Sequence, residues 1–466
     1  MIAARTFAHQ DTGVFGLARS GVASVRALRA GGARVYAWDD KESARIAAEA
    51  EGATVLPWRD WPWEKIKALI LSPGVPLTHP VPHDIVLRAR EAKAEVIGDV
   101  ELFAREIWAD GKNRAPVIAI TGTNGKSTTT ALAGHILTSC GFDAQIGGNI
   151  GKPVLELAQP TAKTIYVLEV SSYQVDLSPG LKPDAAVLSN ITPDHIDRHG
   201  SLENYAAVKA HLLQQAKGGI AVIGVDDSQT SAIYTKISAS GRQALPVSAG
   251  KVLGRGIFVL DGVLYDAQGG RANRIVDLAQ AAHLLGAHNW QNAALAYAAT
   301  KSFARDTRAV ASAIVDFPGL AHRIEDAGRI GAVRFVNDSK ATNADAAERA
   351  LACFSDIFWI AGGRAKEGGI ESLSPHFPRI RKAYLIGEAG KDFARTLEGK
   401  VPYEISGTLA HAVASASADA ARSGIAQPIV LLSPACASFD QFRDFEHRGD
   451  EFRASVAKLA HLKEAS

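Results

Sequence analysis

The sequence predicts an α/β protein made of three consecutive α/β domains, and three observations support this. The chain has 466 residues, more than one hydrophobic core usually holds. Short β-like runs alternate with helical stretches, which indicates parallel sheets covered by helices. Small or polar residues follow most of these β-like runs, as in loops at the end of a strand. We expect the domains at residues 1–111, 112–316 and 317–466.

Composition and charge exclude several classes of protein. Hydrophobic residues make up 47% and charged residues 21%, which is ordinary for a globular protein. The net charge of +2 provides no general field for nucleic acid or an anionic membrane. Cys140, Cys353 and Cys436 are far apart and odd in number, which indicates reduced thiols in a cytosolic protein. No long apolar run is present, so neither a signal peptide nor a membrane span is expected.

The first domain shows a glycine turn after its first β-like run. Residues 16–21 resemble G-x-G-x-x-G, with Ala18 in the place of the middle glycine. Asp39 and Asp40 end the next β-like run. The turn is either a degraded dinucleotide-binding fingerprint or a tight turn without a ligand. A second turn, with Ser72 and Gly74, would lie at the same carboxyl edge of the sheet, where α/β proteins bind ligands.

The second domain opens on a phosphate-binding pattern. In VIAITGTNGKS, the end of G-x-x-x-x-G-K-[ST] is present, but Ile120 occupies the place of its first glycine. The required context of strand, turn and helix is present. Lys126 would then reach the β- and γ-phosphates, and the Ser127 hydroxyl would bind Mg²⁺. The alternative is a glycine-rich turn that happens to precede a lysine.

Polar residues then gather after two later β-like runs. Glu169 lies in TIYVLEVSSYQ, which otherwise reads as a buried strand, so it is a candidate metal ligand or a member of a salt bridge. The segment SNITPDHIDRHG collects polar residues that indicate a site, although any one of them could cap a helix: Asn190, Asp194, His195, Asp197 and His199.

The remaining candidates are weaker when judged from residue patterns alone. Lys209, in ENYAAVKAHLLQQA, reads as a solvated helix lysine. Asn289 and Asn292 share a helix face or simply belong to a helix start. Basic and polar loops recur in the last domain, at residues 322–323, 337–343, 362–369 and 433–449. Arginine and lysine there suit phosphate and carboxylate groups, which favours a binding cleft over scattered surface charges.

Taken together, these motifs resemble the Mur ligases, and within that family the branch that adds D-glutamate. The resemblance covers about residues 12–460 and rests on GTNGKST, GGNIG, EVSSYQ, DHIDRHG, HN..N, HRIE, NDSKATN and SPACASFDQF. The family carries the shorter loop G-x-x-G-K-[ST], which accounts for Ile120. The D-N-P-R loop of the branch that adds diaminopimelate or lysine does not occur here. The resemblance implies a Rossmann-like UDP-binding domain, a central P-loop ATPase domain with a mainly parallel sheet, and a Rossmann-like C-terminal domain.

The resemblance also implies the activity. The chain would be an ATP-dependent carbon–nitrogen ligase of peptidoglycan synthesis, and so of cell-wall formation, cell shape and cell division. Its substrates would be UDP-MurNAc-L-Ala and D-glutamate, and its cofactors ATP and two Mg²⁺ ions. We expect a cytoplasmic monomer with no nucleic acid partner and no membrane insertion. We also expect the C-terminal domain to close on the central domain when ATP binds.

Residue roles are carried over position by position. The resemblance implies an ATP-phosphate loop of Gly122, Thr123, Asn124, Gly125, Lys126, Ser127 and Thr128, with further ATP contacts from Asn292, Arg323, Asp338 and Lys340. One Mg²⁺ would be held by Ser127 and Glu169, and the second by His195 and a carbamylated Lys209. The UDP part would lie against Leu17, Ala18, Arg19, Asp39, Asp40, Ser72 and Gly74, and the acyl end against Asn149 and His195. D-Glutamate would contact Thr342, Lys366, Ser438 and the backbone of Phe445. The catalytic set would be Lys126, Glu169, His195, Lys209 and Arg323.

Two alternatives remain open from the sequence. One is another ligase of the superfamily, such as the L-alanine-adding Mur enzyme or folylpolyglutamate synthase. The other is a P-loop NTPase that uses hydrolysis as a switch for binding a partner. The second would turn over ATP without D-glutamate.

Overall fold

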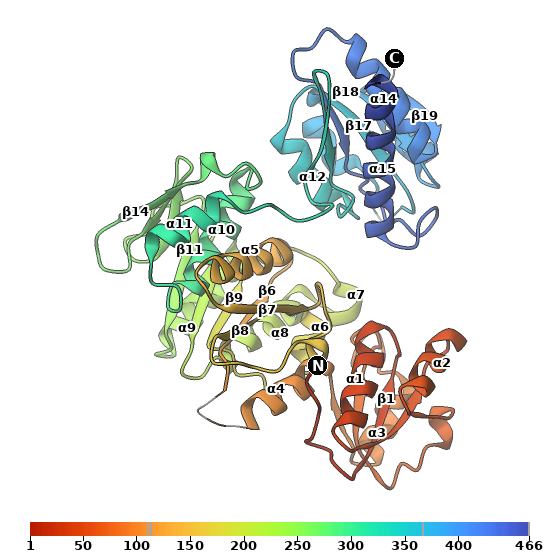
Figure 1. Cartoon of the computed structure of the whole chain (residues 1–466), viewed down its shortest axis with the longest axis vertical. Coiled ribbons are helices and arrows are strands. Elements are labelled where there is room, and N and C mark those ends of the chain that lie inside the picture. Colours follow the sequence, from red (N-terminus) through yellow and green to blue (C-terminus); the bar gives the residue numbers. More distant parts are fainter. Residues whose placement is uncertain (110, 112–113, 366–367, 465–466) are drawn as a thin grey trace. The chain divides into compact units, whose positions relative to one another are not determined.

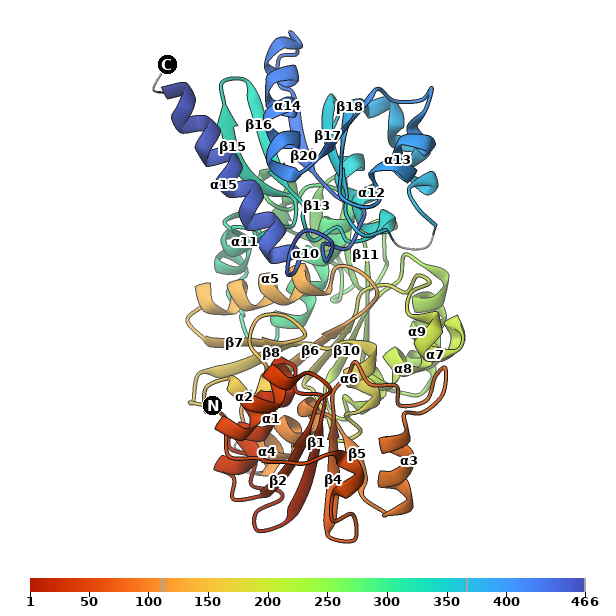
Figure 2. The same ribbon diagram turned by 90° about the vertical axis from the view of Figure 1, so that its right-hand side faces the viewer.

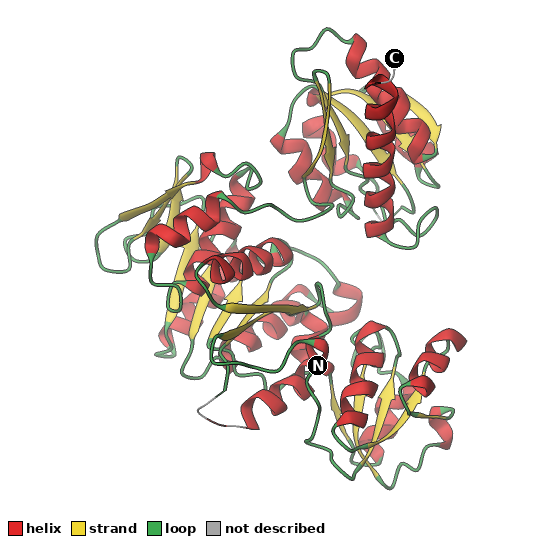
Figure 3. Ribbon diagram, viewed as in Figure 1, coloured by secondary structure: helices red, strands yellow, loops and turns green. Residues whose placement is uncertain are grey.

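The computed structural model describes residues 1–109, 111, 114–365 and 368–464. The chain divides into two compact units, Met1–Ala281 with Asn289–Phe317, and Ala282–His288 with Pro318–Ser466. Within the described residues, three sheets are covered by helices, which confirms the α/β class (Figures 1, 2 and 3). The three domain limits given above stay a prediction. Residues 112–113, at the expected limit between the first and second domains, lie outside the described residues.

The first sheet is parallel and has the strand order β3-β2-β1-β4-β5. Its strands are β1 (Asp11–Phe15), β2 (Arg34–Trp38), β3 (Thr54–Val55), β4 (Ile66–Leu71) and β5 (Glu95–Ile97). The accompanying helices are α1 (Arg19–Ala30), α2 (Glu42–Ala50), α3 (Asp84–Glu91) and α4 (Asp99–Ala109). The strand order reverses at β1, so the crevice between the carboxyl ends of β1 and β4 is where this topology binds ligands.

The central sheet has the order β14-β13-β12-β11-β10-β9-β6-β8-β7. Its strands are β6 (Val117–Thr121), β7 (Asp143–Gly148), β8 (Thr164–Glu169), β9 (Ala185–Leu188), β10 (Ile220–Gly224), β11 (Ala244–Ser248), β12 (Ile257–Leu260), β13 (Val263–Asp266) and β14 (Asn273–Asp277). Strands β7 to β12 pair in parallel, whereas β13 and β14 add an antiparallel edge.

Helices cover the central sheet, which is why its inner strands read as continuous apolar runs rather than alternating ones. These helices are α5 (Lys126–Ser139), α6 (Ser172–Asp176), α7 (Ile196–His199), α8 (Leu202–Gln215), α9 (Ser228–Ala239), α10 (Ala287–Thr300) and α11 (Thr307–Val315). Every residue of β6 and β8 is buried. The polar turns that follow these strands therefore start from fixed points in a rigid core.

The second unit carries a sheet of order β15-β16-β20-β17-β18-β19, parallel except for β15. The strands are β15 (Glu325–Ile330), β16 (Val333–Asn337), β17 (Ile357–Gly362), β18 (Ile380–Ile386), β19 (Tyr403–Gly407) and β20 (Ile429–Leu432). Helices α12 (Ala344–Cys353), α13 (Gly390–Leu397), α14 (Leu409–Arg422) and α15 (Phe445–Glu464) accompany it. Among all described residues, no helix is both long and apolar enough to cross a bilayer.

Candidate active site

The phosphate-binding loop between β6 and α5 is tightly packed. Gly122 and Gly125 both have positive φ angles, of 148° and 81°. A Cβ atom on Gly125 would lie 2.1 Å from Asn292 Oδ1, and one on Gly122 would lie 1.9 Å from Ser189 Oγ. Both positions therefore require glycine. The loop is short, and the close contacts at these two glycines fix its backbone conformation.

The segment that follows β9 holds this loop from one side. The Thr123 N–H donates to the carbonyl of Asn190 (2.8 Å), and the Asn124 N–H donates to Asn190 Oδ1 (2.9 Å). Ser189 Oγ donates to the carbonyl of Asn124 (2.7 Å). Asn190 therefore belongs to the site as a residue that shapes the loop. The sequence pattern had marked it only as one of several polar residues.

Helix α5 begins at Lys126, directly after the loop. The first N–H groups of a helix have no partner within the helix and attract anions. Lys126 Nζ donates to the carbonyls of Gly122 (3.0 Å) and Thr123 (2.8 Å), so its amine lies at the loop. Ser127 and Thr128 are buried in the first turn of the helix. This arrangement can bind a polyphosphate.

Glu169 ends strand β8, beside the end of β6, where it pairs with Ile120. Its side chain is 2% exposed. Oε1 accepts a hydrogen bond from Asn149 Nδ2 (2.7 Å), whereas Oε2 has no hydrogen-bond partner among the described residues. A buried carboxylate oxygen without a partner is costly. Glu169 therefore fits a site for a cation.

Lys209 lies in α8 and is 1% exposed, so the interpretation of a solvated helix lysine is wrong. Its Nζ donates to the Gly122 carbonyl (2.9 Å) and to Thr121 Oγ1 (3.3 Å), and lies 4.6 Å from the centroid of the Tyr205 ring. Burial lowers the pKa of this amine well below its usual value, and the charge of Lys126 lowers it further. The sequence did hold a signal: Lys209 shares helical spacing with the buried Tyr205 and Leu213, on the apolar face of α8.

His195 and His199 belong to the loop and short helix after β9. His195 Nε2 lies 3.4 Å from Asp194 Oδ2, and burial lowers the pKa of His195, which favours the neutral imidazole that metals bind. His199 Nε2 lies 2.9 Å from Ser172 Oγ, and burial lowers its pKa to about 4. The charges of Lys209 and Lys126 also lower the pKa of His195, so this ring lies near the phosphate loop, whereas His199 is a buried core residue.

In the first unit, several predicted substrate residues border one pocket of about 250 Å³. It is lined by Ala18, Arg19, Ser20, Pro73, Gly148, Asn149, Gly151, Pro153 and Gln174. Arg19 Nη2 donates to the Gly151 carbonyl (2.6 Å), and the Leu17 N–H donates to Asp39 Oδ2 (2.6 Å). Asp39 thus shapes the glycine turn, whereas Asp40 is exposed.

Ser72 and Gly74 flank this pocket in the second glycine turn. The Ser72 N–H donates to the Phe15 carbonyl (2.9 Å), and the carbonyl of Gly74 accepts from Arg198 Nη1 (2.9 Å). Arg198 comes from α7, so this contact joins the turn after β4 to the segment that carries His195. Three of the predicted substrate residues, Ala18, Arg19 and Asn149, line the pocket itself.

In the second unit, Asp338 lies between two hydrogen-bond donors after β16. Its Oδ1 accepts from the Ile324 N–H (3.2 Å) and its Oδ2 from Ser433 Oγ (2.8 Å). Burial raises the pKa of Asp338 to about 7, against the lowering effect of the Ser433 hydrogen bond and the Arg323 charge. Arg323 and Asp338 therefore lie near each other.

The other predicted residues of the second unit lie on loops. Lys340 Nζ is 3.8 Å from the centroid of the Phe445 ring, a cation–π contact. Thr342 is half-buried, and its N–H donates to the Lys340 carbonyl (2.8 Å). Ser438 is buried. Lys366 lies outside the described residues.

Arg448 is a further residue of this region that motif reasoning did not assign. Its guanidinium is fully buried. It donates to Ser339 Oγ (3.0 Å), to the Ser339 carbonyl (2.8 Å) and twice to the Cys436 carbonyl (3.1 Å each). Arg448 thereby ties together the loops that carry Lys340 and Ser438.

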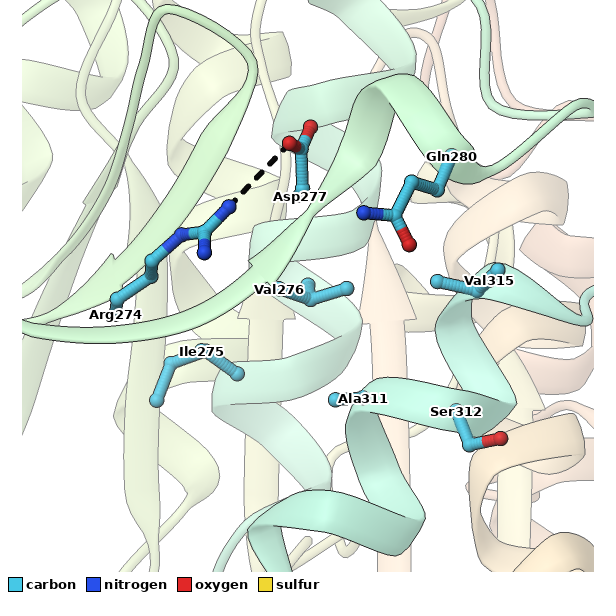
Figure 4. Close-up of a pocket in the computed structure, with 8 residues that line it drawn as sticks. All are labelled: Arg274, Ile275, Val276, Asp277, Gln280, Ala311, Ser312 and Val315. Carbon is cyan, nitrogen blue, oxygen red and sulfur yellow. Dashed lines mark hydrogen bonds and ion pairs between the residues drawn. The ribbon is translucent and has the colours of Figure 1, made fainter.

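A larger pocket, of about 450 Å³, lies elsewhere in the first unit, between β14 and α11 (Figure 4). Its lining includes Arg274 and Asp277, which are joined by an ion pair of 3.3 Å, and the apolar residues Val276 and Val315. None of the candidate residues named above lines it. Pocket size therefore does not identify the site, whereas the chemistry of the phosphate loop does.

No group of three or more His, Cys, Asp and Glu side chains gathers as a metal site in the part of the chain that the structure describes. Glu169 and the Ser127 hydroxyl supply hard oxygen ligands on either side of the loop. Mg²⁺ usually takes one or two protein ligands and completes its shell with phosphate oxygens and water. The residues present therefore fit Mg²⁺ bound together with a nucleotide.

Comparison with known proteins decides the family. Residues 120–300 match the family model described as Mur ligase middle domain. The chain is 55% identical over 462 residues to a UDP-N-acetylmuramoylalanine–D-glutamate ligase of Caulobacter vibrioides, covering 98% of both proteins. The chain belongs to the UDP-N-acetylmuramoylalanine–D-glutamate ligase family. The resemblance drawn from the motifs is confirmed.

Solved structures agree on the fold. A UDP-N-acetylmuramate-alanine ligase, MurC, from Thermotoga maritima matches with a TM-score of 0.60 at 16% identity, covering 97% of this chain and 100% of that one. The MurF ligase of Thermotoga maritima, solved in complex with ADP, matches with a TM-score of 0.56 at 15% identity, covering 87% and 98%. At these identities the likeness establishes a shared multidomain α/β architecture.

Proposed function

We propose that this chain is an ATP-dependent ligase that adds D-glutamate to UDP-MurNAc-L-Ala. The products are UDP-MurNAc-L-Ala-D-Glu, ADP and phosphate, and the reaction belongs to peptidoglycan precursor synthesis. The observation that carries the proposal is the near full-length identity to relatives with this name. The phosphate loop with Glu169 and Lys209 beside it supports the ATP-dependent chemistry.

The reaction has two steps. The carboxylate of the L-alanyl group attacks the γ-phosphorus of ATP, so that an acyl phosphate forms and ADP leaves. The amine of D-glutamate then attacks the acyl carbon, loses a proton and expels phosphate. The protein contributes positioning and charge neutralisation, as in phosphoryl transfer generally.

The phosphate loop and Lys126 act on the nucleotide. The rigid loop presents N–H groups and the start of α5 to the phosphates, which favours negative charge there. Lys126 exchanges its contacts with the Gly122 and Thr123 carbonyls for phosphate oxygens. Arg323 and Lys340 of the second unit supply further positive charge, and Asn292 and Asp338 complete the ATP contacts.

Two Mg²⁺ ions fit the proposal, because they offset charge that develops on the phosphate oxygens. Ser127 and Glu169 would hold one ion, and His195 with Lys209 the other. Glu169 is suited to this by its unpartnered buried Oε2. Asn149 fixes the orientation of the carboxylate through Oε1 and also lines the substrate pocket.

Carbamylation of Lys209 would turn its amine into an anionic ligand. The neutral amine attacks CO₂, forms an N–C bond and releases a proton. Burial favours the neutral amine, since it lowers the pKa of Lys209 well below its usual value. The carbamate would place a negative charge beside the loop where the neutral amine carries none, which suits a cation site.

The substrates are assigned to the two units separately. The pocket with Ala18, Arg19 and Asn149 suits the nucleotide substrate, with Leu17, Asp39, Asp40, Ser72 and Gly74 around it. His195 and Asn149 would contact the acyl end. Thr342, Lys366, Ser438 and the Phe445 backbone would bind D-glutamate. The chain would act as a cytoplasmic monomer.

The assay that tests the proposal measures phosphate release from ATP with UDP-MurNAc-L-Ala and either D-glutamate, L-glutamate, L-alanine or no amino acid. Release only with D-glutamate, with a product heavier by one glutamyl residue, is the expected result. Release with L-alanine would point to another ligase of the superfamily. Release without any amino acid would point to an NTPase switch.

A further inference from the structure

Arg198, the third residue of the short helix α7, has no role in the proposed reaction so far. Its side chain is half-buried. Its Nη1 donates to the carbonyl of Gly74 (2.9 Å), and its guanidinium carbon lies 4.8 Å from the centre of the Tyr173 ring. A planar guanidinium can stack on an aromatic ring and donate hydrogen bonds from its edge at the same time. Arg198 therefore contacts a turn of the first sheet and a helix of the central sheet together.

The turn that contains Gly74 borders the crevice between β1 and β4. The Val75 N–H donates to the Ser72 carbonyl (3.0 Å), which closes the turn. A Cβ atom on Gly16 would lie 2.5 Å from Ser72 Cβ, so the two glycine turns of the first sheet touch. A Cβ atom on Gly74 would meet no atom within 4 Å. The Arg198 hydrogen bond therefore supports a part of the turn that packing leaves open.

The ring of Tyr173 lies between Arg198 and two histidines. Its centre is 5.1 Å from that of His195 and 5.4 Å from that of His199, and the planes of the second pair are 11° apart. The φ angle of His195 is 53°, in the left-handed region that is uncommon for residues other than glycine. Such a backbone persists only where its surroundings hold it. Tyr173 is one of the side chains that hold His195.

The end of α7 packs closely against the loop that follows β4. A Cβ atom on Gly200 would lie 2.7 Å from His79 Nε2. The gap that Pro73, Tyr173 and Arg198 help to border has a volume of only about 10 Å³. A gap of this size holds at most one water molecule. A shift of the loop after β4 must therefore be matched by a shift of α7.

These contacts form a continuous path from the first sheet to His195. We propose that Arg198 is a positioning residue for the ligase reaction: it holds the nucleotide-substrate turn through the Gly74 carbonyl, and it holds His195 through the ring of Tyr173. Arg198 thereby sets the distance between the UDP end of the substrate and its acyl end. This inference rests on the proposed function.

The chemistry of the side chain accounts for an arginine at this position. A lysine would keep the positive charge and could donate to the Gly74 carbonyl. It has no planar group that could lie on the Tyr173 ring while it donates. Lysine should therefore replace one of the two contacts of Arg198 and lose the other.

The first test is Arg198→Met, which keeps the aliphatic part of the side chain and removes the guanidinium. The Kd of UDP-MurNAc-L-Ala, measured by calorimetry without ATP, should rise about tenfold, because the turn loses a hydrogen bond from a charged donor. In steady-state kinetics, kcat should also fall about tenfold, because His195 loses its support. The KM for D-glutamate should not change. An unchanged Kd would overturn the proposal.

Two further variants separate the two contacts of Arg198. Tyr173→Leu removes the ring but leaves the donor to Gly74, so kcat should fall about tenfold while the Kd of UDP-MurNAc-L-Ala stays within about twofold. Arg198→Lys should restore the Kd but not kcat. If Tyr173→Leu raised the Kd as much as Arg198→Met does, or if Arg198→Lys restored both quantities or neither, the proposal would be wrong.

A control and a double variant separate positioning from a general loss of contacts. Arg242 is a half-buried arginine of the same unit whose Nη1 also donates to a backbone carbonyl, that of Gln214 (2.6 Å). Arg242→Met should leave Kd and kcat unchanged, and equal losses there would reject the proposal. Once Arg198→Met is present, Tyr173→Leu should lower kcat no further, whereas effects that multiply would also reject it. Lack of turnover in the unaltered protein would reject the proposed function instead.

Discussion

Each unit buries a long cationic side chain almost completely, and the two side chains do different things. Lys209 in the first unit donates to two oxygens at the phosphate loop, on Thr121 and Gly122. Arg448 in the second unit makes four hydrogen bonds, to Ser339 and Cys436. Both side chains are nearly inaccessible to water.

The difference lies in what burial does to each group. Burial lowers the pKa of Lys209 well below its usual value, which favours a neutral, nucleophilic amine. Burial also lowers the pKa of Arg448, but only to about 10, so the guanidinium stays charged at neutral pH. The buried lysine can therefore react as a nucleophile, whereas the buried arginine stays charged and joins two loops by hydrogen bonds.

Replacing Lys209 should have the largest effect, because it tests whether the buried amine takes part in the reaction. Lys209→Met keeps the length of the side chain and removes the amine. We expect kcat to fall about 1000-fold, within the range seen when a group that stabilises the transition state is removed, and the melting temperature to stay close to its original value. Lys236→Met, in which an exposed lysine of α9 is changed, should keep full activity. Activity above a tenth of the original in Lys209→Met would refute the assignment.

Replacing Glu169 tests whether this carboxylate binds a cation beside the phosphate loop. Glu169→Gln keeps the acceptor for Asn149 but removes the negative charge that suits a cation. The Mg²⁺ concentration for half-maximal activity should rise about 100-fold. Titration of activity with Mg²⁺ measures this, with the exposed Glu203→Gln as the control. An unchanged Mg²⁺ requirement would argue that Glu169 is not a ligand.

Replacing Arg448 tests whether its buried hydrogen bonds stabilise the fold. Arg448→Met leaves the carbonyl of Cys436 and the backbone of Ser339 without their buried donor, so the free energy of unfolding should fall by about 2 kcal/mol. Urea unfolding measures the loss, and Arg395→Met, in which the arginine is 80% exposed, should cost far less. If both variants unfold at the same urea concentration, the cross-link is not important for stability.

The smallest expected effect is the pH dependence that comes from His199. Its pKa is about 4 in the folded chain, below the usual 6.5, so its contribution to stability is present above pH 6.5 and is lost as the pH falls through 4. The part of the acid-induced loss that comes from this residue should be on the order of 1 kcal/mol, because a shift of one pKa unit corresponds to about 1.4 kcal/mol. His199→Phe should flatten the fall in unfolding free energy between pH 6.5 and 4. An unchanged slope would show that the histidine does not titrate in this way.

The parts of the site that are local in sequence could be predicted from it. The strand, glycine turn and helix around Lys126 are contiguous, and Glu169 stands out as an acid in an apolar strand. Lys209 did not stand out, because its contact with Gly122 joins residues 87 positions apart. Residue patterns alone therefore assigned it to the surface, and only the family resemblance gave it a role.

Contacts between distant loops were the part that could not be predicted. Arg448 meets Ser339 across 109 positions, and Asn190 holds Asn124 across 66. Each of these side chains looks like an ordinary polar residue until the fold brings its partner near.

The most direct test of the central claim follows an oxygen atom. UDP-MurNAc-L-Ala labelled with ¹⁸O in both oxygens of the L-alanyl carboxylate is incubated with the protein, ATP and D-glutamate, and the released phosphate is analysed by mass. If the carboxylate attacks ATP, each phosphate carries one ¹⁸O atom, because the carboxylate oxygen leaves with it. Phosphate without ¹⁸O would contradict the acyl-phosphate mechanism and indicate that water, rather than the carboxylate, attacks ATP.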